Sequence, residues 1–487
     1  MQNPPHPTNL NNENKIPTNP MPEKSITQQI IDRATLDKTQ PISFNGIQLE
    51  NACYFPPQPG FHIPENFWKT SKDPNLKEEI QTLWTHGPVG VAYANHGWGH
   101  AVEAYAQAQS LARMGIPTIL FDILEIYPKN LRNFFRTGLY LSNEWLQKKG
   151  IIKMFPQEPK IFPAVLRTLN KIYRLFERPF SRPITTFIKE FKLSHLTSSH
   201  PLPLGLLRKK ANSITNNKPF FFSQWIPDHF GPLALAYAIV NHPAIYNGVF
   251  DEEAKVILHK LYHVPENNIT VWGNQLGPES IYLTENNPHA EALKNTKDSL
   301  TILLTASGSG AEGPIMEKFL HDFAPELQKK NSRYRLILFV GNHKALKLDI
   351  ERCLQNLVLT NSPHVELFSC TSLLEVAAYR GLLPAFCPCL GAKCGEPAIQ
   401  VGLGYAYLSF GPTTPNEYYN EKYAIKTLQA GLKLPNWKTT NLLTWFTEKQ
   451  ENKDLTNCST NGYTKAIRYG IFEHALWIRN QITKHRK

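Results

Sequence analysis

VGVAYANHGWGHAVEA, residues 89–104, is the stretch of sequence that decides the fold. The apolar run Val89–Ala94 predicts a buried strand, and the glycines at positions 97 and 99 end it in a tight turn. A helix-like string then extends from His100 to about Arg113. A strand that turns into a helix in this way is typical of a βαβ unit, and it places His100 near the positive end of the helix dipole.

The same alternation of strands and helices continues along the chain. A strand over 118–124 follows a Gly/Pro turn, and four later apolar runs each lead into a helix: TILLT, YRLILFV, LLPAFCPCL and AYLSF. Two such sets, over 85–290 and 300–440, predict two Rossmann-like halves with parallel sheets. Ligands of such folds bind at the carboxyl ends of the strands. The terminal segment, residues 463–487, predicts one basic amphipathic helix.

The predicted organisation has four parts. Residues 1–40 are rich in Asn and Pro and are expected to be a disordered polar N-terminus. Residues 41–295 form an N-terminal Rossmann-like domain, and residues 296–440 form a second such domain. Residues 441–487 form a C-terminal helical segment.

The composition limits the possible functions. The chain has 487 residues, of which 41% are hydrophobic, so it can build two or three domains with real cores. The formal net charge of +12 points to an anionic partner: nucleic acid, an anionic lipid surface or a phosphorylated substrate. The seven cysteines form no CxxC pair and no zinc set, which favours reduced thiols in the cytosol. No apolar run reaches the ~20 residues of a membrane span.

Two glycine-rich turns in the second half predict anion sites. An apolar strand ends in four small residues before a helix: Ser307, Gly308, Ser309 and Gly310. Lys393 and Gly395 likewise precede a helix that begins near Glu396. Backbone amides at such turns bind anions, although the first motif is not the GxxxxGK[ST] loop of a nucleoside triphosphatase. An ordinary flexible turn is the alternative for each.

Other polar residues lie near predicted strand ends or on helix faces. His200 and Asp228 each follow an apolar stretch, and Glu417 and Asn420 lie one helical turn apart. The alternatives are a satisfied turn histidine and a solvated helix face. A basic stripe repeats at helical spacing: Arg167, Lys171, Arg174 and Arg178. Such a stripe is typical of a helix on an anionic membrane, or of an ordinary helix with a solvated face.

The order of these motifs resembles that of the GT-B glycosyltransferases that make glycolipids, of the family 28 type. Monogalactosyldiacylglycerol synthase and the processive diacylglycerol glucosyltransferases are the most similar members. HGWGHAVEA, LTSSHPLP and WIPDHFG are similar to the family's glycine turn with its histidine, its Ser-x-His-Pro segment and the stretch with its Asp. LLTASGSGAEGPI, LILFVGNHKAL, AKCGEP and NEYYN resemble its glycine-rich loop, Gly-Asn strand end, Lys-x-Gly and Gln-Glu-x-x-Asn signatures.

The resemblance implies a fold and an activity. The fold is GT-B: two Rossmann-like domains with parallel sheets that face a central cleft, and a C-terminal helix that packs back toward the N-terminal domain. The activity is transfer of a sugar from a nucleotide-sugar, a UDP-hexose, to a lipid acceptor such as diacylglycerol at an anionic membrane surface. Neither a metal nor a cofactor is implied, and no nucleic acid. The implied location is cytoplasmic and peripherally membrane-associated.

The resemblance also implies roles for particular residues. Asp228 is the general base, and His100 positions the donor or assists at the cleft. The acceptor side of the cleft has Gly97, Gly99 and His200. The donor side has Ser307, Gly308, Ser309, Gly310, Asn342, Lys393, Gly395, Glu396, Gln400, Glu417 and Asn420. The basic stripe would contact the membrane.

The chain departs from the family's pattern at three informative positions. Trp98 enlarges the glycine turn, Gln400 stands where a ribose-binding carboxylate is expected, and Asn416 replaces a glutamine. Three alternatives stay open. They are a sugar-nucleotide epimerase of the same fold, a degenerate GT-B module that binds nucleotide or membrane without turnover, and a nucleic-acid binder indicated only by charge.

Overall fold

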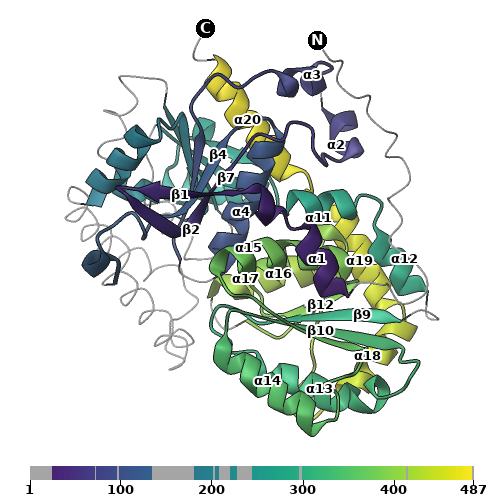
Figure 1. Ribbon diagram of the computed structural model, residues 1–487. Coiled ribbons are helices and arrows are strands. Elements are labelled where there is room, and N and C mark those ends of the chain that lie inside the picture. The colour runs from purple at the N-terminus through teal and green to yellow at the C-terminus, as the bar shows by residue number, and fades with distance from the viewer. Residues whose placement is uncertain are drawn as a thin grey trace, which may run out of the picture.

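The computed structural model describes residues 25–71, 73–95, 98–133, 180–200, 203–207, 220–226, 244–295, 299–412 and 415–484. These residues form two α/β halves, each built around one sheet (Figure 1). The predicted α/β class with two Rossmann-like halves is therefore confirmed.

The described part of the N-terminal sheet has eight strands in the order β1-β2-β4-β3-β5-β6-β7-β8. From β4 to β8 all neighbours are parallel, whereas β2 runs antiparallel to β4 and β1 runs antiparallel to β2. Every residue of β3 is buried, which explains why its sequence is an unbroken apolar run. The strands are β1 Gln40–Phe44, β2 Ile47–Phe55, β3 Val89–Tyr93, β4 Thr118–Asp122, β5 His195–Ser198, β6 Phe221–Trp225, β7 Ile245–Val249 and β8 Ile269–Val271.

The C-terminal sheet is parallel throughout and has the order β11-β10-β9-β12-β13-β14. Numbered from its own first strand, this is the order 3-2-1-4-5-6 of doubly wound nucleotide-binding folds. The strands are β9 Leu300–Thr305, β10 Tyr334–Gly341, β11 Val365–Ser369, β12 Cys389–Ala392, β13 Ala406–Ser409 and β14 Gly431–Lys433.

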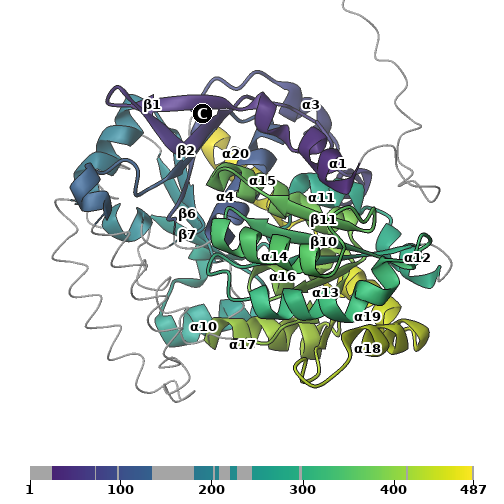
Figure 2. The same ribbon diagram turned by 60° about the horizontal axis from the view of Figure 1, so that its bottom comes forward.

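Helices cover the sheets and join the halves. Helices α13 and α14 lie below the C-terminal strands in Figure 1 and come forward in Figure 2, and α15 and α16 lie on the opposite face. Helix α4 packs on α15, so one apolar core cluster contains residues of both halves. The longer helices are α1 Ile26–Arg33, α4 Trp98–Arg113, α10 Glu252–Tyr262, α13 Gly313–Leu327, α14 Lys344–Asn356, α15 Leu373–Leu382, α17 Pro415–Lys422, α18 Leu442–Glu451, α19 Asp454–Lys465 and α20 Gly470–Lys484.

Shorter helices fill the connections. The α-helices among them are α2 Glu65–Thr70, α3 Leu76–Gln81, α11 Pro278–Leu283, α12 Pro288–Lys294 and α16 Glu396–Ile399. Single turns of other helix types are η1 Thr35–Lys38, η3 Glu266–Asn268, η4 Leu383–Phe386, η5 Val401–Leu403 and η6 Tyr423–Thr427. Helices α11 and α12 follow the N-terminal sheet in sequence, yet α11 packs on α15 and α12 packs on α19.

The prediction of one continuous terminal helix was wrong. The chain leaves helical geometry at Ala466, where ψ is 148°, and α20 begins only at Gly470. Between the two helices, the buried Arg468 donates hydrogen bonds to the carbonyl oxygens of Gly402 and Thr284, both at 2.9 Å. A Cβ at Gly470 would lie 1.3 Å from the Trp272 carbonyl oxygen, so this close approach fixes the break.

Helix α20 returns to the N-terminal half, as predicted. It lies beside α4 in Figure 1. The Ser110 hydroxyl donates to the Ile471 carbonyl oxygen at 2.8 Å, and Arg479 donates to the Met114 carbonyl oxygen at 3.0 Å. Because both donor groups are buried, these bonds fasten the end of the chain to α4.

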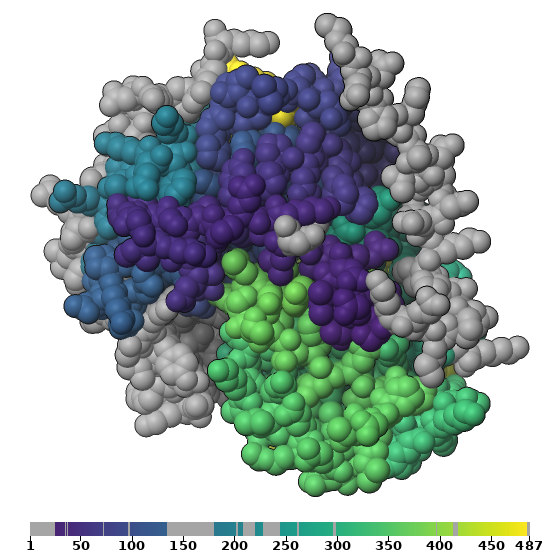
Figure 3. Space-filling model, in the orientation of Figure 1, coloured from purple at the N-terminus to yellow at the C-terminus, as the bar shows by residue number. Residues whose placement is uncertain are grey.

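The expectation of disorder up to residue 40 was wrong from residue 25 onward. Ser25 caps α1 by accepting a hydrogen bond from the Gln28 amide at 3.0 Å. The amide of Thr27 donates to Glu366 of β11 at 2.9 Å, so α1 is held on the C-terminal half. The following strands β1 and β2 belong to the N-terminal sheet, and residues 25–55 thus lie across both halves (Figure 3).

Candidate active site

The N-terminal sheet brings two predicted cleft histidines together. Strand β3 lies between β4 and β5, so the connections diverge on either side of its carboxyl end. His100 lies in the first turn of α4, which follows β3, and His200 follows β5. Their ring centroids are 4.7 Å apart in an edge-to-face contact. The Ser199 hydroxyl donates to the His100 carbonyl oxygen at 2.8 Å, which ties the two turns to each other.

A carboxylate that the sequence reasoning missed accompanies this pair. Glu103 Oε2 lies 3.9 Å from His100 Nδ1, and the Glu103 side chain is only 3% exposed. The i, i+3 spacing on a predicted helix was the available signal, because such residues share a face. At this distance the two side chains attract each other as an ion pair only when the His100 ring is protonated.

The C-terminal sheet brings the two predicted anion turns together. Strands β9 and β12 are neighbours although α13, α14 and α15 separate them in sequence, so the topological switch point lies between them. The 307–310 turn follows β9, and the 393–395 turn follows β12. Lys393 Nζ forms an ion pair with Glu417 Oε1 at 3.1 Å, with side chains 10% and 14% exposed. The 393–395 turn and helix α17, which carries Glu417 and Asn420, are therefore in direct contact.

The other predicted donor residues differ in their exposure. Asn420 and Gln400 are buried, whereas Asn342 is exposed just after β10. Gly395 has no positive φ, and a Cβ there would meet nothing within 4 Å, so the backbone does not require glycine at this position.

The glycine-rich loop 307–310 already has internal hydrogen-bond partners. The Ser307 amide and hydroxyl donate to Glu312 Oε2 at 2.8 and 3.0 Å. The Gly310 amide donates to the Ser307 carbonyl oxygen at 3.0 Å. A phosphate that uses the Ser307 amide must displace the Glu312 carboxylate, which sequence reasoning did not single out.

Trp98 joins the two switch regions. Its indole, 5% exposed, lies 5.0 Å from the His343 ring and 6.1 Å from the Phe339 ring, measured between centroids. The Arg380 guanidinium lies 5.4 Å from the indole centroid. His343 Nε2 in turn shares a hydrogen bond with the Ser307 carbonyl oxygen at 3.1 Å. Trp98 and His343 thus link the first turn of α4, where His100 also lies, to the 307–310 loop across the boundary between the halves.

Several predicted site residues lie outside the described residues. They are Gly97, Asp228, Arg167, Lys171, Arg174 and Arg178. Gly99 lies in the first turn of α4, and Glu396 begins α16. Within the described ranges, no group of three or more His, Cys, Asp or Glu side chains is arranged to hold a metal ion, and metal independence stays a prediction.

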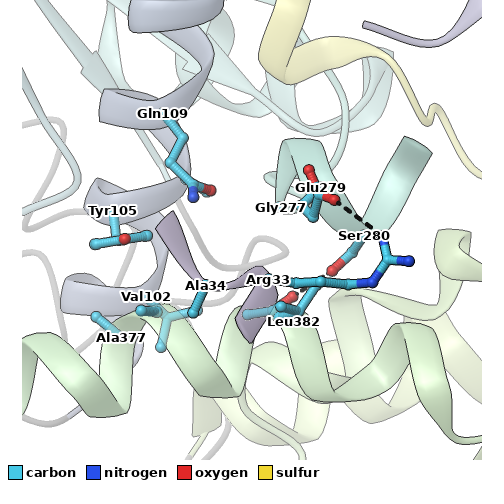
Figure 4. Close-up of a pocket in the computed structure, with 13 residues that line it drawn as sticks. Arg33, Ala34, Val102, Tyr105, Gln109, Gly277, Glu279, Ser280, Ala377 and Leu382 are labelled. Carbon is cyan, nitrogen blue, oxygen red and sulfur yellow. Dashed lines mark hydrogen bonds and ion pairs between the residues drawn. The ribbon is translucent and has the colours of Figure 1, made fainter. Parts of the chain in front are cut away.

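A second polar cluster lies between the halves, away from the switch points. A pocket there is lined by α1, α4, α11 and α15, and Figure 4 shows Glu279 reaching toward Arg33. Arg113 donates to Glu279 Oε2 at 2.6 Å, and His62 Nδ1 lies 2.9 Å from the same oxygen. Burial alone would raise the pKa of Glu279, but the hydrogen bond from His62 and the charge of Arg113 lower it to about 2. Glu279 therefore stays ionised at neutral pH, and its ion pairs hold Arg33 of α1 and Arg113 of α4 against α11.

Comparison with known proteins gives only distant similarity. No protein-family profile matches the chain, and no curated protein sequence matches it. The UDP-GlcNAc 2-epimerase from Neisseria meningitidis, solved with UDP-GlcNAc, is similar at 14% identity over 82% of this chain and 100% of its own, with a TM-score of 0.44. The putative UDP-N-acetylglucosamine 2-epimerase from Listeria monocytogenes is 13% identical over 83% of this chain and 97% of its own, with a TM-score of 0.46. A glycosyltransferase from Rickettsia africae is 11% identical over 82% of this chain and 100% of its own, with a TM-score of 0.39.

At these scores the similarities do not decide the fold or the function of this chain. The architecture itself does define a class. A mainly parallel N-terminal sheet, a fully parallel C-terminal sheet, switch points joined across the boundary and a C-terminal helix that returns to the N-terminal half make this a two-domain α/β protein of the GT-B type.

Proposed function

We propose that the chain is a glycosyltransferase that moves a hexose from a UDP-sugar to a lipid acceptor such as diacylglycerol. One observation carries the proposal. The switch points of both sheets meet through Trp98 and His343, with a histidine pair on one side and two anion turns on the other. Ligands of open α/β sheets bind at such points.

The donor would lie on the C-terminal half. Lys393 supplies a cation beside the switch point, and its partner Glu417 lies one turn from the buried Asn420. By the resemblance, these residues and Gln400 contact the nucleotide. An incoming diphosphate would compete with Glu417 for Lys393, which frees the carboxylate for ribose hydroxyls.

The chemistry would be a single displacement. The acceptor oxygen forms a bond to the anomeric carbon, the bond from that carbon to the diphosphate oxygen breaks, and UDP leaves with the electron pair. Asp228 would take the acceptor proton, a role that rests on the resemblance. His100, with Glu103 nearby, would position the donor or assist at the cleft.

The lipid acceptor and a peripheral, cytoplasmic location complete the proposal. Their support is the net charge of +12, which favours an anionic surface, and the resemblance of the motifs. Among the described residues, no helix has the length and apolar character needed to cross a membrane. Attachment would then be at the surface, through the basic stripe named above.

The first test is calorimetric titration of the full chain with UDP and ADP in EDTA. We expect saturable UDP binding, and Lys393→Met should weaken it by roughly tenfold or more, because a charge-assisted bond is lost. Lys330→Met, which removes an exposed cation before the first residue of β10 in the same half, is the matched control. Absence of binding by the unchanged chain would overturn the donor site.

The second test is turnover of UDP-hexoses with lipid vesicles. Asp228→Asn should lower the rate by about 10²–10⁴-fold while UDP affinity is unchanged. The buried Gln400, which stands where a ribose-binding carboxylate is expected, favours a second candidate, a GT-B module that binds nucleotide without turnover. UDP binding with no transfer from any UDP-hexose would support that candidate.

A further inference from the structure

Trp98 belongs to the N-terminal half by sequence and contacts the C-terminal half with its side chain. Its ring neighbours, Phe339, His343 and Arg380, all come from β10, the turn after it and α15. The indole also lies against the backbone of Gly341, where a Cβ would come within 2.2 Å of it. Only glycine leaves room for this contact.

His343 extends the contact to the donor loop. Its Nε2 bonds the Ser307 carbonyl oxygen at 3.1 Å, and its ring lies 3.7 Å from where a Cβ of Gly310 would be. Glu312 holds the same loop from the other side, through the Ser307 amide at 2.8 Å. The loop conformation is therefore fixed between Glu312 and His343, and Trp98 packs on His343.

We propose that Trp98 is an interdomain positioning residue that acts through His343 on the conformation of the 307–310 loop. The separation of the two halves and the loop that a nucleotide phosphate would meet are then coupled. Because the Trp98 indole packs on both Gly341 and His343, separation of the two halves would withdraw it from His343. The nucleotide part of this inference rests on the proposed function, whereas the loop part does not.

Hydrogen exchange of the full chain tests the loop part without any ligand. Trp98→Ala should speed exchange of the Ser307 and Gly310 amides in the other half, and Trp98→Phe should restore part of the protection. Trp84→Ala is the matched control, because Trp84 bonds the Gly87 carbonyl oxygen at the amino edge of β3. Unchanged exchange of the loop in Trp98→Ala would overturn the proposal. If that variant does not fold, His343→Ala is measured in its place with the same expectation.

UDP titration tests the coupling to the site. Trp98→Ala and His343→Ala should each weaken UDP binding by about fivefold or more, within the range of typical coupling effects. The double variant should be no weaker than the worse single one, because both act through the same loop. If Trp98→Ala speeds exchange of the loop but the unchanged chain does not bind UDP, the positioning role stands and the nucleotide site is rejected. UDP binding with additive losses would reject the coupling and retain the site.

Discussion

At the scale of single residues, Gly341 shows how one backbone position permits an interdomain contact. Its φ is +54°, a left-handed value that residues with a Cβ rarely adopt, and the Trp98 indole occupies the space of a side chain. Both the conformation and the contact therefore demand glycine. Neither demand is visible in the sequence, where Gly341 only ends an apolar strand.

Gly341→Ala should destabilise the protein by about 1–3 kcal/mol, since it strains φ and displaces the indole. Denaturant unfolding monitored by tryptophan fluorescence measures this. Gly395→Ala is the control, because a Cβ there meets nothing within 4 Å. Equal effects of the two substitutions would contradict the steric argument.

Glu312 places a negative charge where a phosphate is expected. Glu312→Gln keeps an acceptor for the Ser307 amide and removes the charge, so UDP and pyrophosphate should bind roughly fivefold more tightly, from about 1 kcal/mol of lost repulsion. Titration calorimetry measures the change, with Glu351→Gln on α14 as a control. Weaker binding by Glu312→Gln would instead show that the carboxylate builds the loop.

At the scale of elements, a buried histidine pair joins β5 to α20. His195 Nε2 shares a hydrogen bond with the Ser223 hydroxyl at 2.8 Å, and that hydroxyl lies 3.5 Å from His474 Nε2. Burial lowers the pKa of His195 to about 3. Burial lowers the pKa of His474 well below its ordinary value, and repulsion from a protonated His195 would lower it further. Both rings are therefore neutral in the folded protein at neutral pH.

The free energy of unfolding should fall between pH 7 and pH 5. An unfolded histidine binds a proton as the pH drops through about 6.5, whereas these folded ones do not, so each costs about 2 kcal/mol over this range. Denaturant unfolding at each pH measures the slope. His474→Phe should reduce it, and His321→Gln, on the exposed face of α13, should not. An unchanged slope in His474→Phe would exclude the pair as its cause.

At the scale of the whole molecule, three described segments add to the packing of α4 on α15 in holding the two halves together. They are α1, which lies on β11; α11, which packs on both α4 and α15; and α20, which returns to α4. The Glu279 cluster connects the first two of these, because Arg33 of α1 and Arg113 of α4 both approach its carboxylate. Any motion between the halves must therefore keep the buried, ionised Glu279 paired with these arginines or expose it to water.

Glu279→Gln should destabilise the protein by about 3–5 kcal/mol, because the Arg113 side chain would keep a buried charge without its partner. Denaturant unfolding measures this, and Glu65→Gln, which breaks an exposed pair with Lys77, should have little effect. A small loss in Glu279→Gln would show that water replaces the carboxylate at this site.

The sequence by itself determined the local order of this protein. Apolar runs such as Val89–Ala94 and glycine breaks specify strands and turns, because backbone preference and periodicity act over a few residues. These local signals also predicted that His100 and the 307–310 turn lie at strand ends. The alternation of strands and helices predicted the two halves. The motif order supplied a hypothesis for the activity that periodicity could not.

Only the tertiary structure decided which distant residues meet. The ion pair of Lys393 with Glu417, the contact of Trp98 with Gly341, and the helix break before Gly470 each depend on a neighbour far along the chain. The attachment of α1 to Glu366 likewise needs a carboxylate more than three hundred residues away. Such contacts arise from packing in three dimensions, where the free energy of burial and pairing overrides local preference.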